Sequence, residues 1–162
     1  MDLVDDVDAI AGLDRLAFQF FKLFAQYEYA LKAMGYATSG RNRQAEPDWD
    51  RFANQVGALV MDVQDQEIQD ARQYILDTPP KRQVWVDNEV QWEVVANLER
   101  SPQILFAHIR RVRNNLYHGG KFNGRWIDPD RSQELIGKSL KVLRALVALN
   151  PDLSNAINGN QA

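Results

Sequence analysis

The chain has 162 residues, of which 45% are hydrophobic and 25% are charged, as expected for one globular domain. It contains no cysteine, which excludes disulfides and thiolate metal sites. The net charge of −3 argues against a surface covered with basic residues for nucleic acid, although the distribution of charge matters more than its sum.

The beginning of the chain, residues 1–12, is acidic and has no basic cluster, so it does not resemble a secretory signal. We expect this segment to be disordered, or alternatively to occupy the basic cleft of a partner. No apolar run reaches the roughly 20 residues needed to span a bilayer, and we expect a cytoplasmic protein without a membrane partner. Residues 13–150 are expected to form one helical domain, and residues 151–162 a fraying tail.

The first half of the domain has helical periodicity. Apolar residues recur at helical spacing from Leu13 to Met34, and Gly35 follows as a C-cap. After a polar loop, the spacing predicts a second long helical region from Asp48 to about Leu76, interrupted in its acidic middle.

The middle of the sequence has a weaker pattern. The segment DTPPKRQ predicts a stop. Residues 84–86 are expected to be a short extended piece, and a helix is expected from Glu89 onward. Together with the helices that follow, this pattern predicts an all-α bundle of four to five helices.

The last two helices have clear start signals. Ser101 is expected to be an N-cap with Pro102 at the first helical position, and the helix should end at Gly119. Asp128 and Pro129 repeat this pattern at the start of the last major helix.

The stretch RRVRNNLYHGGKF, residues 110–122, ends the first of these helices with three arginines, two asparagines and a histidine. Histidine exchanges protons near neutral pH, and arginine offers a fixed fork of donors to phosphate. The stretch has no carboxylate to hold Mg²⁺. These residue types favour cleavage of RNA through its own 2′-OH, with His118 as general acid or base and Arg113 stabilising the charged transition state.

Helical geometry separates these two side chains. At 100° per residue from Leu105, Arg113 falls at about 80° and His118 at about 220°. The helix must therefore end near His118, and either the long side chain of the arginine or a second subunit must close the gap.

The hexapeptide RNNLYH, Arg113–His118, resembles the R-x4–6-H motif of the HEPN superfamily, including the polar residue after the arginine. The resemblance implies a HEPN-like bundle and a metal-independent endoribonuclease without a cofactor. It also implies a homodimer in which two motifs face a shared cleft, acting as a toxin of a toxin–antitoxin pair or as an anti-phage effector. Its partners would be RNA and an antitoxin or defence-system protein. Arg113 and His118 would be catalytic and Asn114 supporting.

One departure from the family concerns control. A toxin subfamily carries a tyrosine, modified by its antitoxin, two residues after the histidine, where this sequence has Gly120. We expect further RNA contacts from the basic and aromatic residues around the motif: Arg110, Tyr117, Lys121, Arg125 and Trp126.

Other interpretations remain open. Arg113 would serve as an ordinary salt-bridge partner, His118 as a C-cap whose imidazole bonds free carbonyls, and His108 as a packing residue. Glu28 either orients Arg113 across the bundle or is solvated. The alternative function is a catalytically inactive HEPN-like helical adaptor or nucleotide-binding interaction module.

Overall fold

The computed structural model describes residues 3–96, 99–121 and 123–160. These ranges contain six α-helices, two 3₁₀ helices and two antiparallel hairpins. The helices are α1 (Leu3–Ala33), α2 (Trp49–Gln55), α3 (Gln66–Asp77), α4 (Pro102–Tyr117), α5 (Pro129–Leu149) and α6 (Pro151–Ile157), with η1 (Arg41–Arg43) and η2 (Gly57–Asp62). The strands are β1 (Ala37–Ser39), β2 (Ala45–Pro47), β3 (Arg82–Val86) and β4 (Glu89–Glu93). The mainly helical class is confirmed, but neither hairpin was predicted.

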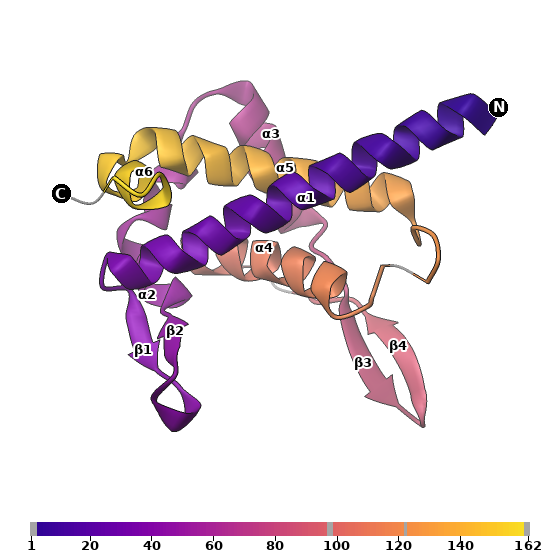
Figure 1. Ribbon diagram of the computed structural model, residues 1–162, viewed down its shortest axis with the longest axis horizontal. Coiled ribbons are helices and arrows are strands. Elements are labelled where there is room, and N and C mark those ends of the chain that lie inside the picture. Colours follow the sequence, from indigo (N-terminus) through magenta and orange to yellow (C-terminus); the bar gives the residue numbers. More distant parts are fainter. Residues whose placement is uncertain (1–2, 97–98, 122, 161–162) are drawn as a thin grey trace.

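The helices form one packed body, and α1 runs along its whole length (Figure 1). α1 contacts α5 and α6, α3 also packs on α5, and α2 packs on α4. The two hairpins project in the same direction from opposite ends of the body, with β3 and β4 near the C-terminal end of α4 (Figure 1). The end of α4 therefore lies beside a projecting arm.

An aromatic cluster joins α1, α2 and α4 in the core. Trp49 at the start of α2 stacks on Phe24 and Tyr27 of α1, with ring centroids 5.2 and 6.1 Å apart. Phe106 of α4 also stacks on Trp49, at 6.2 Å. Buried aromatic pairs of this kind add to the free energy gained from burial, so this cluster fixes how α4 sits against the rest of the body.

The starts of the last helices were predicted correctly. The Ser101 hydroxyl accepts a hydrogen bond from the Ile104 N–H at the start of α4, and Asp128 accepts one from Arg131 at the start of α5. In both helices a proline occupies the first turn, where its missing N–H costs nothing.

The expectation of a disordered N-terminus was wrong for the residues described, because residues 3–12 prolong α1. Residues 1 and 2 lie outside the described part. Acidic side chains near a helix N-terminus complement the positive end of the helix dipole. The aspartates that suggested disorder therefore suit the start of a helix.

The second long helical region is divided into α2, η2 and α3. Gly57 lies at the break, where an added Cβ would come within 2.6 Å of the Phe106 ring. The glycine allows the backbone to approach α4 closely, and Asp65 then caps α3 by accepting from two backbone N–H groups.

The expected helix from Glu89 is instead strand β4, which pairs with β3. Asp87 and Asn88 both have positive φ, 52° and 61°, which is typical of the two-residue type I′ turn. This turn matches the right-handed twist of the strands. The dipeptide Asp87–Asn88, between residues 82–86 and 89–93, was therefore the sequence signal for a hairpin.

The expected fraying tail is also wrong for residues 151–157, which form α6. Asn150 caps the helix, Leu153 is completely buried, and α6 packs against α1 and α5. Residues 161 and 162 lie outside the described part. The N-cap and proline that begin α4 and α5 also begin α6, but its seven residues are too few for a recognisable helical pattern of apolar residues.

Because Leu153 is part of the core, Leu153→Ala should lower the free energy of unfolding by about 2–4 kcal/mol. Chemical denaturation measures this change. The control is Asn155→Ala on the exposed side of α6, which should stay within about 0.5 kcal/mol of wild type. A frayed tail would make both substitutions equally neutral.

Candidate functional site

The motif lies where α4 ends. His118 is the C-cap residue, and its backbone N–H donates to the Asn114 carbonyl at 2.9 Å. Gly119 has a φ of +79°, and the Gly120 N–H donates to the Asn115 carbonyl at 3.0 Å. This is a Schellman ending, in which a glycine in the left-handed region stops the helix. The helix thus ends at His118, as the sequence predicted.

A groove of about 440 Å³ follows the exposed side of α4 and is closed on one side by β3. We call it the basic groove. Its wall residues are Arg82, Gln83, Ala107, Arg110, Arg111, Asn114, Asn115 and His118. Three are arginines, two are asparagines and none is a carboxylate, although Arg82 is ion-paired at 2.9 Å with Glu93 of β4, which is not a wall residue. The groove therefore offers donors to an anion, chiefly from Arg110 and Arg111, and no ligands typical of Mg²⁺.

Arg111 is held in this wall by a buried histidine. Arg111 Nη1 lies 3.0 Å from His108 Nδ1. A guanidinium has no acceptor, so His108 must accept at Nδ1 and carry its proton at Nε2. His108 is 2% exposed, and its Nε2 has no hydrogen-bond partner within the described residues. The expectation that His108 only packs is therefore incomplete, because it also orients Arg111.

Electrostatics in and beside the groove are consistent with crowded positive charge. Burial, followed by the charge of Arg111, lowers the pKa of His108 to about 4. Burial and then the neighbouring Arg82 lower the pKa of Arg111. The ion pair of Arg82 with Glu93, at 2.9 Å, already offsets part of this repulsion, and a bound anion would relieve the rest.

Arg113 lies on a different side of α4 from the groove. Its guanidinium stacks over the rings of Tyr117, at 4.6 Å, and Phe24, at 5.6 Å. It lines a separate hollow of about 180 Å³ between α4 and α1. A single subunit therefore does not bring Arg113 and His118 into the same hollow, in line with the angle between them.

Asn114 and Tyr117 lie between the two sides. Asn114 Oδ1 accepts from Arg113 Nη1 at 3.1 Å, and Asn114 also lines the basic groove. The Tyr117 ring is 63% exposed and meets the His118 ring edge to face at 5.3 Å. Both residues thus connect the motif's arginine with its histidine.

Glu28 does not orient Arg113. Its carboxylate accepts from the Trp49 indole N–H at 3.4 Å.

Four of the five expected RNA contacts lie outside the basic groove, including Tyr117, which lines the separate hollow with Arg113. Trp126 is 8% exposed and donates from its indole to Asp14 of α1 at 2.8 Å, so its expected stacking on a base is wrong. Lys121 is partly buried with its ammonium over the Trp92 ring at 4.8 Å, and burial lowers its pKa. Arg125 is exposed in the loop after α4. Of the five residues expected to contact RNA, only Arg110 lines the groove.

The sequence interpretation missed Arg82, Gln83 and Arg111 as groove residues. Arg111 lies within the motif stretch and was available from its position on the helix. Arg82 and Gln83 reach the groove only because the segment after DTPPK returns as a strand beside α4. No local pattern gives that approach.

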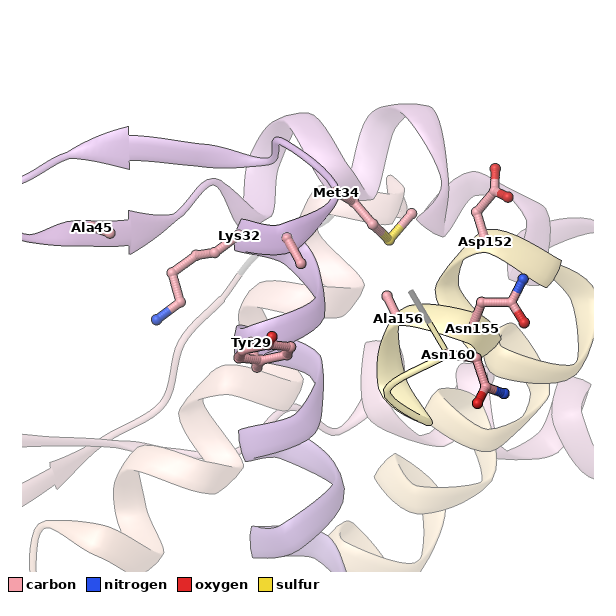
Figure 2. Close-up of a pocket in the computed structure, with 9 residues that line it drawn as sticks. Tyr29, Lys32, Met34, Ala45, Asp152, Asn155, Ala156 and Asn160 are labelled. Atoms are coloured by element: carbon pink, nitrogen blue, oxygen red, sulfur yellow. The ribbon is translucent and has the colours of Figure 1, made fainter. Parts of the chain in front are cut away.

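A larger hollow, of about 790 Å³, lies at the opposite end of the body between α1 and α6. Figure 2 shows that Lys32 extends toward the β1–β2 side, while Asp152 and Asn155 stand on α6 across the opening. Its charged groups do not converge on one point, so we place the candidate site at the basic groove.

Comparisons with family models, with curated proteins and with solved structures found no match to this protein. Among the described residues, no helix is both long and apolar enough to cross a membrane. In the same part of the molecule, no three histidine or carboxylate side chains gather where they could hold a metal ion.

The buried histidine predicts a dependence of stability on pH. As the pH falls from 6.5, the ordinary pKa of histidine, to about 4, the unfolded protein binds a proton that folded His108 does not accept. The free energy of unfolding should fall across this interval by at most about 3 kcal/mol and stop changing through this group at lower pH. Denaturant titrations at a series of pH values measure the slope.

The control variant is His108→Gln, which keeps an acceptor for Arg111 but does not titrate. Its stability should fall less over the same interval. Equal slopes in both proteins would show that His108 is protonated in the folded state as easily as in the unfolded state.

Proposed function

We propose that this protein is a metal-independent endoribonuclease of the HEPN type. The observation that carries the proposal is the basic groove, whose wall His118 shares with three arginines and in which no wall residue is a carboxylate. A groove of this composition suits a phosphodiester, and its histidine suits proton transfer. The RNNLYH resemblance supports the same chemistry and shares Asn114, Asn115 and His118 with the groove.

The reaction requires only groups of the protein, the RNA and water. His118 takes the proton of the 2′-OH, and the 2′ oxygen forms a bond to phosphorus as the bond to the 5′ oxygen breaks. The leaving 5′ oxygen takes a proton from water, and the resulting hydroxide takes the proton that His118 holds, which restores the neutral imidazole. The products are a 2′,3′-cyclic phosphate and a 5′-hydroxyl. Arginines in the groove stabilise the extra negative charge of the transition state.

The role of Arg113 depends on a second subunit. Within one subunit its guanidinium faces α1 rather than the groove. Phe21 of α1 and Tyr117 of α4 line the same hollow as Arg113 and are both exposed, and Phe18 is exposed elsewhere on α1. A two-fold contact on this side would bury these rings and bring two copies of the motif together. We therefore keep a homodimer, with Arg113 acting at its centre, as part of the proposal.

The second candidate is a HEPN-like adaptor that binds nucleotides without cleaving them. The separation of Arg113 from His118 favours it, because the motif's two reactive groups do not share a hollow in one subunit. Action as a toxin or anti-phage effector, with an antitoxin or defence protein as partner, rests on the resemblance alone. Gly120 in place of the modified tyrosine points to a different mode of control.

We expect the protein to cleave single-stranded RNA in EDTA and to leave a 2′,3′-cyclic phosphate and a 5′-hydroxyl. His118→Ala should reduce the rate by at least about 100-fold, because general acid–base catalysis is typically worth that much. Gel analysis and end-group chemistry of the products measure both effects. The exposed position of His118 at the helix end leaves folding intact, which circular dichroism checks.

A single 2′-deoxy substitution at the cut site is the matched substrate control, since it removes the nucleophile. Efficient cutting of this substrate would exclude the mechanism, as would a strict requirement for Mg²⁺. Binding without cleavage under all conditions would favour the adaptor.

We expect the protein to sediment as a dimer at micromolar concentration and Phe21→Asp to make it monomeric, because a buried carboxylate facing the partner is costly. Leu59→Asp is the control, since Leu59 is also exposed but lies on η2. If Phe21→Asp abolishes cleavage together with the dimer, Arg113 acts across the interface. A monomeric wild type with full activity would refute the role given to the second subunit.

A further inference from the structure

The β3–β4 hairpin has two chemically different faces. Its register pairs Gln83 with Trp92 and Trp85 with Val90. Side chains alternate along a strand, so these four residues share one face. The opposite face carries Arg82, Val84, Val86, Glu89, Gln91 and Glu93. We call the first the tryptophan face.

The tryptophan face is largely open to solvent. Trp85 is 68% exposed, Val90 56% and Trp92 36%. The hairpin projects away from the helical body, so no helix covers its outer half (Figure 1). A two-stranded hairpin is marginally stable by itself in water, and an exposed apolar patch of this kind marks a binding surface.

This face continues directly into the basic groove. Gln83 belongs to both, because it lines the groove and lies opposite Trp92 on the tryptophan face. Trp92 is also the anchor of the face, since its indole packs against Gly120 and under the ammonium of Lys121. If the phosphates of an RNA strand lie in the groove, the next nucleotides of that strand therefore lie beside the exposed tryptophan face.

We propose that the β3–β4 hairpin is a stacking arm for single-stranded RNA, in which unpaired bases adjoining the bound phosphates stack on Trp85. The inference rests on the proposed function only in taking RNA as the ligand, because stacking needs no cleavage. Every base has a π face, so such an arm reads strandedness rather than sequence. Bases within a duplex are stacked on one another and cannot reach it.

Charge selects this occupant over a second copy of the protein. The arm begins at Arg82, which shares the groove wall with Arg110 and Arg111 and is ion-paired with Glu93 at 2.9 Å. The carboxylates of the hairpin, Asp87, Glu89 and Glu93, lie at its turn and on the opposite face, so the tryptophan face itself carries none. A second copy docked arm to arm would bring the same positive groove alongside the first. A single-stranded nucleic acid supplies both a negative backbone for the groove and flat apolar rings for the tryptophan.

The test measures binding in the His118→Ala background, so that the probe is not consumed. The probe is a fluorescent oligouridylate of about 12 nucleotides, within the span of common single-strand sites, and its anisotropy is compared with that of an RNA duplex of equal length. Trp85→Ala should weaken binding of the single strand about 5- to 100-fold and leave the weaker duplex binding unchanged. Trp85→Phe should retain most of the affinity.

Two controls separate stacking from other effects. Val86→Ala alters the opposite face of the same hairpin and should bind like its parent. The loss caused by Trp85→Ala should be similar at about 50 and about 200 mM salt, whereas the loss caused by Arg111→Ala should shrink as salt rises, because phosphate contacts are screened.

Each outcome decides the inference. If the parent and Trp85→Ala bind single-stranded RNA equally, the stacking arm is refuted while the proposed function stands. The same conclusion follows if Trp85→Ala dissociates a dimer without changing RNA binding. If RNA binds through Trp85 but the wild-type protein does not cut it, the inference of a stacking arm stands and the proposed nuclease activity is refuted. No binding of single-stranded RNA by any variant overturns both.

Discussion

The packing of Trp49 is the constraint on which the candidate site depends. Its ring is held between α1 and α4 by stacking on Phe24, Tyr27 and Phe106. The outer edge of the same cluster carries charge, with Arg110 lying 5.9 Å from the Trp49 ring. The core thus sets the position of α4 and limits the freedom of an arginine that lines the basic groove, so folding and preorganisation of the site share one set of contacts.

The geometry of a single helix explains why the motif's arginine and histidine face different hollows. An angle of about 140° between them cannot be closed by side-chain length once Arg113 is stacked on Tyr117 and Phe24. The structure places Arg111 and Arg110 near His118 instead. A catalytic role for Arg113 then requires either its release from these rings or a partner subunit, and the two alternatives differ in whether activity depends on protein concentration.

Local signals predicted what local chemistry decides, namely the capped starts of α4 and α5 and the glycine ending after His118. Contacts between distant segments were not predictable in the same way. Trp126 follows a basic loop and suggested a base-stacking residue, yet its indole is bonded to Asp14, 112 positions earlier in the sequence. The wall that β3 adds to the groove also depends on such a contact, because Arg82 and Gln83 have no sequence signal of their own.

The charge of the protein is distributed in a way that its sum of −3 conceals. The wall of the groove contributes arginines from α4 and β3 without a carboxylate, and the long N-terminal helix begins with aspartates. Arg82 and Arg111 repel each other, and Arg111 is held by the neutral His108, which accepts its hydrogen bond without offsetting its charge. A carboxylate in the place of His108 would have stabilised the empty groove. The imidazole of His108 orients the guanidinium of Arg111 without neutralising it, so the positive charge of Arg111 is available to an anion. This arrangement favours phosphate binding at the expense of the stability of the protein without phosphate.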